Sequence, residues 1–372
     1  MRHIYLDYNA STPIAPEVAA AMRSLIDDAF GNPSSLHWAG APARKVVEAA
    51  RSQVAALLGC QPREIVFTSG GSEANNLAIK GAFFASGRER CHFITTSVEH
   101  PAIVGPLRFL ERLGAEVTWL PVDGTGRIDP DDLRHAIRAD TVLVSIMHAN
   151  NEVGTIQPIA ECVTVAREHG VPFHTDAAQS VGKIPTRVDD LGIDLLTVAG
   201  HKLYAPKGVG ALYIRNGMQL EPLIHGAGHE NGRRAGTESA LLAAALGIAC
   251  NIAAQNMGSD GVRVLRDSFW SRLEAGFGER VKLNGHPEHR LPNTLNVSFV
   301  GRVGADILAA LDGVAASTGS ACHSGMIELS PVLQAMGVAP EAGMGAIRFS
   351  LGRGTTVEEI DIVLDRLKQV LG

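Results

Sequence analysis

Residues 195–210 read LLTVAGHKLYAPKGVG. The first four residues are apolar or β-branched and predict a buried strand, and the glycines and proline further on predict a loop rather than a helical face. Lys202 stands in that loop. Most lysines lie at protein surfaces, but a lysine directly after a buried strand either snorkels to solvent or forms a Schiff base. Its placement here favours the Schiff-base interpretation.

The region around this segment alternates between short β-branched runs and helical patterns, from about residue 14 to residue 250. Most positions in the predicted strands are apolar, as in a sheet covered by helices on both faces. The alternation predicts an α/β fold with a mainly parallel sheet. The predicted strands are 64–68, 92–96, 116–120, 141–146, 171–175 and 195–198, and residues 72–80 predict a helix.

The pattern changes after about residue 262. A helix over 262–277 precedes strands over 294–299 and 346–350, and a last helix over 357–371 begins with a capping-box pattern of Thr356 and Glu359. We therefore expect a smaller α+β domain after the large one. The expected division is 14–255 for the large domain, with 1–13 and 256–372 forming the small C-terminal domain.

Composition narrows the class of function. The net charge of −6 argues against a nucleic-acid-binding surface. Residues 241–254 are apolar but too few to span a bilayer, and the N-terminus reaches Asp7 before any long apolar run, so we expect a cytoplasmic protein with no membrane contact. The five cysteines are widely spaced and form no Cys-X-X-Cys pair. We expect neither a disulfide framework nor a bound metal.

Polar residues follow several of the predicted strands, and ligands of an open parallel sheet bind beyond the carboxyl ends of its strands. Gly70-Gly71-Ser72 could present backbone N–H groups to an anion at a helix N-terminus, although an ordinary turn has the same pattern. Asp176 ends an apolar strand and would either meet a cation, such as a pyridinium nitrogen, or cap a helix. Asn150-Asn151 could bind a ligand heteroatom or cap a loop.

Cys322 is the candidate nucleophile among the cysteines. It lies in a run of small residues, 315–325, which predicts a movable loop with an accessible thiol. The thiolate would be the reactive form. Cys250 and Cys162 stand in apolar surroundings and are predicted to be buried and inert.

Taken together, these segments resemble the pyridoxal-phosphate-dependent cysteine desulfurases of the fold-type I, class V aminotransferase-like superfamily. The match runs almost end to end in one order, and the Gly-Ser-Ala-Cys form of the cysteine loop is similar to that of the housekeeping and nitrogen-fixation desulfurases. The resemblance implies pyridoxal 5'-phosphate as the cofactor and a homodimer. Further segments that carry it are 5–13, 31–37, 97–100 and 348–353.

The resemblance also implies roles for individual residues. Lys202 would bond the cofactor and transfer protons, Asp176 would pair with the pyridine nitrogen, and Gln179 would bind the ring hydroxyl. His100 would stack on the ring and take part in catalysis. Cys322 would accept sulfur from L-cysteine as a persulfide, with L-alanine as the other product.

The remaining implied site residues bind the phosphate or the substrate. Thr237 would reach the phosphate from the partner subunit, and Arg348 would hold the substrate carboxylate as a two-pronged fork. The phosphate-binding residues are Gly71, Ser72, His201 and Thr237, and the substrate-binding residues are Asn32, Asn151, Arg348 and His323, of which Asn151 also contacts the cofactor.

Some positions depart from the family pattern. Ala199 replaces a serine that commonly supplies a phosphate hydroxyl, and Gly226-Ala227-Gly228 replaces a run of three glycines. His323 is read either as a solvent-exposed loop residue or as a group that tunes the thiolate or a selenium leaving group. The acceptor of the persulfide would be another protein.

Three other functions stay open at this point. The segment 321–324 is also similar to that of the selenocysteine lyases, which release selenium and L-alanine from L-selenocysteine. An aminotransferase on the same fold would need Lys202 and Asp176 but not Cys322. A sulfur-carrier scaffold would require a lost cofactor site, against which Asp176, Gln179 and Lys202 argue. Cys322→Ala separates a desulfurase, which should lose sulfide release from L-cysteine, from an aminotransferase, which should be indifferent to the change.

Overall fold

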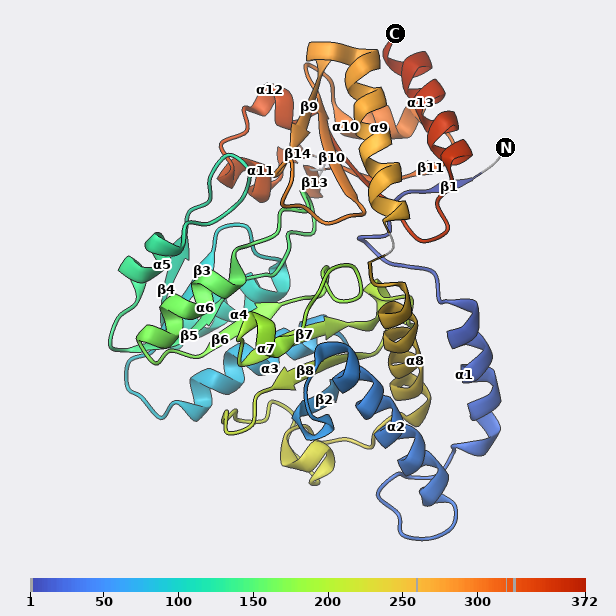
Figure 1. Cartoon of the computed structure of the whole chain (residues 1–372). Helices are drawn as coiled ribbons and strands as arrows, with labels where there is room; N and C mark the ends of the chain where they lie inside the picture. Colours follow the sequence, from blue (N-terminus) through green and yellow to red (C-terminus); the bar gives the residue numbers. More distant parts are fainter. Residues whose placement is uncertain (1–2, 259, 319, 324–325) are drawn as a thin grey trace.

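The structure is a computed structural model that describes residues 3–258, 260–318, 320–323 and 326–372, with side chains left out for 320–323 and 326–328. Figure 1 shows a larger lower part, coloured blue to yellow, and a smaller upper part, coloured orange to red. The first described strand, β1 (Ile4–Tyr5), and the C-terminus both lie at the upper part.

The larger part is built on a seven-stranded sheet in the order β2-β8-β7-β6-β5-β3-β4. All neighbouring strands are parallel except β8, which runs antiparallel to both β2 and β7. The mainly parallel α/β sheet predicted from the sequence is therefore confirmed. The strands are β2 (Ile65–Thr68), β3 (His92–Thr96), β4 (Glu116–Leu120), β5 (Thr141–Ser145), β6 (Phe173–Asp176), β7 (Leu195–Ala199) and β8 (Gly210–Ile214).

Helices cover both faces of this sheet. Because successive strand residues point to opposite faces, Phe67 packs in one core cluster and its neighbour Val66 in another. The first cluster holds α1, α2, α6 and α8, and the second holds α3 and α4. The helices of this part are α1 (Pro16–Asp28), α2 (Gly40–Leu58), α3 (Gly71–Ala85), α4 (Pro101–Glu111), α5 (Pro130–Ala136), α6 (Ile159–Glu168), α7 (Val188–Leu191) and α8 (Ala240–Asn256).

Helix α8 contains the apolar run 241–254, and more than half of its residues are buried. It packs closely on α2 because Gly247 has no side chain there. A Cβ atom at Gly247 would lie 2.7 Å from the Cα atom of Ala50. Among the described residues no single helix is long and apolar enough to cross a membrane. One bent pair of helices, Ala240–Asn256 with Gly261–Arg280, reaches the length and apolar composition of a membrane span, by those two measures only.

The smaller part has an antiparallel four-stranded sheet in the order β12-β15-β10-β9. Its helix α13 begins at the predicted capping box, in which the Thr356 hydroxyl accepts from the Glu359 N–H at 3.3 Å and the Glu359 carboxylate accepts from the Thr356 N–H at 3.1 Å. The elements are β9 (Val281–Asn284), β10 (Thr294–Phe299), β11 (Val314–Ala315), β12 (Ser317–Thr318), β15 (Ala346–Ser350), α9 (Gly261–Phe277), α10 (Gly304–Ala310) and α13 (Val357–Leu371).

The N-terminal residues join the smaller part. Strand β1 (Ile4–Tyr5) pairs in parallel with β11, and Ile4 and Leu6 are buried in the core cluster that α9 and α13 also form. These contacts support our division into 14–255 and 1–13 with 256–372, which we keep as a proposal.

The segment around Cys322 forms a hairpin, whereas the sequence predicted a loop. Strand β13 (Ser320–His323) pairs antiparallel with β14 (Met326–Leu329), with Cys322 opposite Ile327. The hairpin leads into α11 (Pro331–Ala335) and α12 (Pro340–Gly343), and four single turns complete the chain: η1 (Pro62–Glu64), η2 (Gly200–Lys202), η3 (His229–Gly232) and η4 (Gly278–Arg280).

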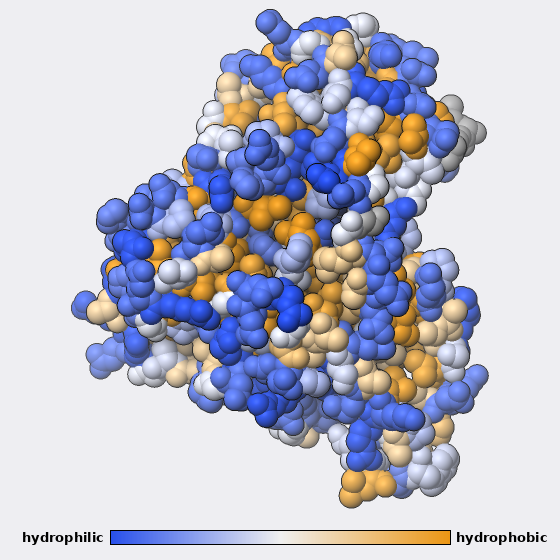
Figure 2. Space-filling model, viewed as in Figure 1, coloured by the Kyte–Doolittle hydropathy of each residue, from blue (hydrophilic) through white to orange (hydrophobic). Residues whose placement is uncertain are grey.

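Apolar side chains reach the surface at several places on the face shown in Figure 2. One is the hollow between the two parts, and another is the lower tip, where Figure 1 places the connection between α1 and α2. In that connection Phe30 is 70% exposed, Leu36 89% and Trp38 81%. These three large apolar side chains on one connection form an exposed apolar patch.

Candidate active site

A cavity of about 500 Å³ opens where β2, β5, β6 and β7 end. This is the carboxyl edge at which the sequence analysis placed the ligand. Eight of the predicted site residues line it together: Gly71, Ser72, His100, Asn151, Asp176, Gln179, His201 and Lys202.

Lys202 stands at the end of the single turn η2 that follows β7. Its Nζ atom donates hydrogen bonds to the backbone carbonyls of Asn9 and Ala10, the second at 2.9 Å. Burial, with the charge of Arg348, lowers the pKa of Lys202 to about 8, although Asp176 and Asp7 oppose the shift. A lysine with a lowered pKa keeps more of its amine neutral, which is the nucleophilic form.

Asp176 is the last residue of β6 and is only 6% exposed. One carboxylate oxygen accepts from the Asn75 amide at 2.7 Å, and the other accepts from the Ala178 backbone N–H at 2.9 Å. Both donors are neutral, and within the described part of the chain no ion pair satisfies this carboxylate. A buried carboxylate without a paired cation at a cavity wall suits a cationic ring nitrogen.

His100 is the N-cap residue of α4. Its Nδ1 atom accepts from the Ala102 N–H at 3.1 Å, and the rest of the ring is open to the cavity. Surrounding atoms desolvate the ring and lower the pKa of His100; Asp176 opposes this shift, and Lys202 adds to it. The neutral ring therefore offers a flat face to the cavity.

The N-terminus of α3 also lines the cavity. Gly70 caps this helix with a φ of 150°, a conformation that favours glycine, and no side chain caps the first N–H groups. Burial, followed by the charges of Lys202, Lys207 and His100, lowers the pKa of His201 to about 4. Free helix N–H groups beside a neutral histidine and a lysine suit a phosphate.

One residue of this part of the cavity was not foreseen, and another was expected from the sequence. Lys207 lines the cavity, and its position in the quoted 195–210 segment could have signalled it. A Cβ atom on Gly71 would lie 3.2 Å from the Ala199 methyl group, so that methyl sits directly beside the helix start. The substitution of alanine for serine therefore removes a hydroxyl from the phosphate end.

Arg348 and Asn151 come together, as predicted. Arg348 lies on β15 and donates to the Asn151 carbonyl at 2.8 Å and to Asp7 at 2.7 Å, while its Nε atom is buried without a partner. Asp7 was not predicted as a site residue. Its place as an acid next to the apolar residues at the start of the chain could have indicated it. The guanidinium already holds one carboxylate, so it has the chemistry to hold another.

Gln179 is fixed from both ends of its amide. Its Nε2 atom donates to the Asn9 carbonyl at 2.9 Å, and its Oε1 atom accepts from Lys183 at 3.0 Å. Lys183 also donates to the Asn9 side chain at 3.2 Å. Lys183 was missed, and its only signal was its place four residues after Gln179.

The other predicted site residues do not line the cavity of this chain. Asn32 is exposed between α1 and α2, where its side chain accepts from the Ser34 N–H at 2.9 Å. Thr237 is exposed and lines a separate hollow of about 200 Å³ that shares Ser69, Gly208 and Val209 with the main cavity. The side chains of Cys322 and His323 lie outside the described residues.

The cavity residues fit pyridoxal phosphate. The group needs an amine for its aldehyde, an acid for its ring nitrogen, a flat face for its ring and N–H donors for its phosphate. Lys202, Asp176, His100 and the start of α3 supply these four features around one cavity. The sheet and this donor set together define a pyridoxal-phosphate enzyme.

Comparison with known proteins specifies the family. Residues 4–363 match the aminotransferase class-V family, and the chain belongs to it. The chain is 50% identical to a cysteine desulfurase IscS of Dictyoglomus turgidum, over all of this chain and 95% of the relative. Two solved structures are similar to it. One is a NifS-like protein with a TM-score of 0.93 and 35% identity, covering 99% of each chain, and the other is titled SspA in complex with cysteine, with a TM-score of 0.84 and 39% identity, covering 94% of this chain and 98% of that one.

Proposed function

We propose that this protein is a cysteine desulfurase that converts L-cysteine to L-alanine and holds the removed sulfur as a persulfide on Cys322. The observation that carries the proposal is the pairing of Lys202, whose pKa is lowered to about 8, with the buried Asp176 across one cavity. The full-length identity to proteins named cysteine desulfurase IscS supports the choice of substrate. L-Selenocysteine is the alternative substrate.

The cofactor supplies an electron sink for the substrate's α-carbon when it is bound. Lys202 would hold it through Nζ, and Asp176 would keep a proton on its ring nitrogen. Gly71, Ser72 and His201 would bind its phosphate. Lys202 would also take and return the proton of the substrate's α-carbon, because its amine titrates near neutral pH.

Arg348 and Asn151 would orient the substrate through its carboxylate. Since Arg348 already binds Asp7 at 2.7 Å, the arriving carboxylate would share or displace that partner. The unpartnered Nε atom of Arg348 offers one donor that the Asp7 contact does not use. Two donors on one planar group fix both the position and the rotation of a carboxylate.

Cys322 would then act as the nucleophile. Its thiolate forms an S–S bond with the substrate sulfur, the substrate's C–S bond breaks with its electron pair moving to the carbon fragment, and protonation yields alanine. The hairpin is tied to the site at its far end, because the Ser330 hydroxyl donates to Glu152, the neighbour of Asn151. A second protein would later take the sulfur.

The test is steady-state formation of alanine and sulfide from L-cysteine by the yellow holoenzyme. Cys322→Ala should abolish sulfide release and keep the colour, whereas Lys202→Ala should lose both. Cys60→Ala is the matched control, because burial raises the pKa of the Cys60 thiol to about 12 and leaves it unreactive. Full sulfide release by Cys322→Ala, or release dependent on Cys60, would overturn the proposal. A strong preference for L-selenocysteine would favour the alternative.

We further propose that the enzyme works as a homodimer. Thr237 and Asn32 lie outside the chain's own cavity, and the exposed Leu36 and Trp38 lie on the connection that carries Asn32. A second copy could cover this surface and bring Thr237 to the phosphate end. Light scattering should give twice the chain mass, and Trp38→Asp should lower it. A monomer that retains full activity would contradict the dimer.

A further inference from the structure

A second cavity, of about 560 Å³, lies between the larger and smaller parts. Its walls come from the N-terminal segment, the turn after β7, α9 and the start of α13. Lys202 is the one described residue that lines both this cavity and the candidate active site. The two cavities therefore both reach Lys202.

The charges on the wall of this cavity all have one sign. Lys183, Lys202 and Arg353 line it, and its described lining contains no aspartate or glutamate. Lys183 bonds only to the neutral oxygens of Asn9 and Gln179, and no described carboxylate pairs with it. Burial, with the charges of Lys202 and Arg348, lowers the pKa of Lys183 to about 7. A cation buried without a counter-charge is costly, and an anion beside it would relieve that cost.

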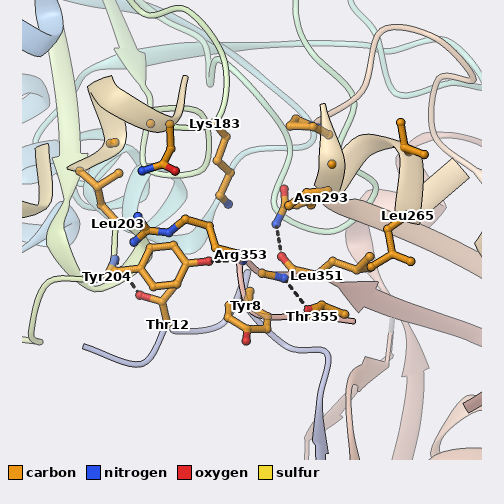
Figure 3. Close-up of a pocket in the computed structure, with 18 of the residues that line it drawn as sticks. Tyr8, Thr12, Lys183, Leu203, Tyr204, Leu265, Asn293, Leu351, Arg353 and Thr355 are labelled. Carbon is orange, nitrogen blue, oxygen red and sulfur yellow. Dashed lines mark hydrogen bonds between the residues drawn. The ribbon is translucent and has the colours of Figure 1, made fainter. Parts of the chain in front are cut away.

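Arg353 faces the same space. Its guanidinium lies 3.8 Å from the centre of the Tyr204 ring, and its backbone N–H donates to the Tyr204 hydroxyl at 2.9 Å. Figure 3 shows Arg353 stacked on Tyr204, Lys183 extending toward the middle of the cavity, and Leu265 on the far side. Stacking orients the guanidinium without neutralising it.

The rest of the wall is largely apolar. Leu203, Leu265 and Leu351 line it, with hydroxyl and amide groups from Thr12, Thr355 and Asn293 at intervals. Small-molecule sites have this composition: an apolar lining with a few polar groups that orient the ligand, in a volume of roughly 300–1,000 Å³. The occupant that suits it has one negative head and an apolar body.

We propose that this interdomain cavity binds a small amphipathic carboxylate, whose head lies between Lys183 and Arg353 and whose body packs on Leu265. The occupant reaches Lys202 from a cavity other than the active-site cavity. Its binding therefore changes the environment of the cofactor lysine without entering the substrate's place. This inference goes beyond the desulfurase activity and does not depend on it.

The test uses octanoate as the probe and octanamide as its neutral counterpart, titrated into the holoenzyme by calorimetry. Octanoate should bind saturably, and octanamide should bind at least about tenfold more weakly, because it cannot use the charges. Arg353→Met and Leu265→Trp, which remove the cation and fill the space respectively, should each weaken octanoate binding by about tenfold or more. Lys368→Met, which removes an exposed lysine of α13, is the matched control and should not change it.

A second comparison distinguishes this cavity from the active site. Arg348→Met should leave octanoate binding intact while raising the KM for L-cysteine, and octanoate should shift the visible absorbance of the cofactor in the parent enzyme. Each variant is scored only if it is yellow and melts cooperatively. Equal binding of octanoate and octanamide would overturn the proposal. So would binding that survives both Arg353→Met and Leu265→Trp, or that is lost with Arg348→Met alone.

Discussion

The ion pair between Arg51 and Glu230 should contribute more to stability than any exposed pair in the chain. Arg51 donates to the two carboxylate oxygens of Glu230 at 2.7 and 2.9 Å, and the side chains are 6% and 1% exposed. Glu230 also accepts from the Phe67 N–H at 2.9 Å. The pair joins α2 to the turn η3, where Glu230 itself has a φ of 49°. Removing Arg51 leaves the buried Glu230 carboxylate without its cation, whereas Arg51 without Glu230 would keep the Ile65 carbonyl and Glu48 as partners.

The magnitude follows from that burial. Arg51→Met should lower the free energy of unfolding by about 3–5 kcal/mol, because the Glu230 carboxylate is left unpaired. Glu230→Met should also destabilise the protein, since it removes the acceptor of the Phe67 N–H and leaves the Arg51 guanidinium with only the Ile65 carbonyl and Glu48. The double variant leaves neither charge of this pair buried. It leaves the Phe67 N–H without its acceptor, which should lower the free energy of unfolding by about 1–3 kcal/mol. It should therefore be more stable than either single variant.

Urea unfolding followed by circular dichroism measures this order. The control is Arg272→Met, which breaks an exposed pair with Asp361 whose atoms lie 2.6 Å apart and whose side chains are 43% and 47% exposed. That change should cost about 0–1 kcal/mol. The reasoning is refuted if Arg51→Met costs no more than Arg272→Met, or if the double variant is the least stable of the set.

Three further predictions concern single residues. The apoprotein should bond pyridoxal phosphate with a midpoint near pH 8, because the neutral amine of Lys202 accumulates as pH rises through its lowered pKa of about 8 rather than 10.5; absorbance at the imine band measures this, and a midpoint above pH 10 contradicts it. Burial raises the pKa of Glu99 from 4.5 to about 8, so the folded protein keeps a proton that the unfolded chain releases. The free energy of unfolding should therefore fall as pH rises from 4.5 to about 8, by up to about 1.4 kcal/mol per pH unit. Glu99→Gln should remove that pH dependence in melting experiments. Ser330→Ala should slow sulfide release and keep the cofactor spectrum, because it frees the end of the β13–β14 hairpin from Glu152; an unchanged rate in the same assay would show that this hydrogen bond does not position the hairpin.

Local pattern was sufficient for most of the fold. The predicted strands 92–96 and 116–120 match β3 and β4 residue for residue. Strand β3 is buried at every position, whereas β4 is the edge strand and is buried only at Leu120. The run Gly210–Ile214 was not assigned to a strand. It forms β8, and its antiparallel place between β2 and β7 depends on the chain reversal at the glycine-rich loop before it. That reversal leaves no periodic signal.

The hairpin around Cys322 shows a second limit of local pattern. Small residues and glycine have low strand propensity, so residues 315–325 predicted a loop. Strand β13 nevertheless pairs with β14, residue 322 opposite residue 327. The apolar residues of the partner strand lie in β14, which begins after the predicted loop 315–325. Pairing between neighbouring segments can override the propensity of either one.

Residues of the candidate site were predictable where a side chain carries the chemistry. Asp176 stands out because a charged residue ends a buried strand, and Lys202 because it closely follows one. Asn9 did not stand out, because its contacts with Gln179 and Lys202 are made by its backbone carbonyl, which accepts from Gln179 at 2.9 Å and from Lys202. A carbonyl is present at every residue and gives no sequence signal. Only the folded path of the chain selects it.

That path makes the N-terminal segment a structural link between the two parts. Residues 4 and 5 pair with β11 of the smaller part, and Asp7 binds Arg348 on β15. Two residues later, the Asn9 and Ala10 carbonyls accept from Lys202 of the larger part. A shift of the smaller part would therefore act on the cofactor lysine through fewer than ten residues of chain. In the proposed function, a substrate carboxylate that displaced Asp7 from Arg348 would act on the same segment and so on the placement of Lys202.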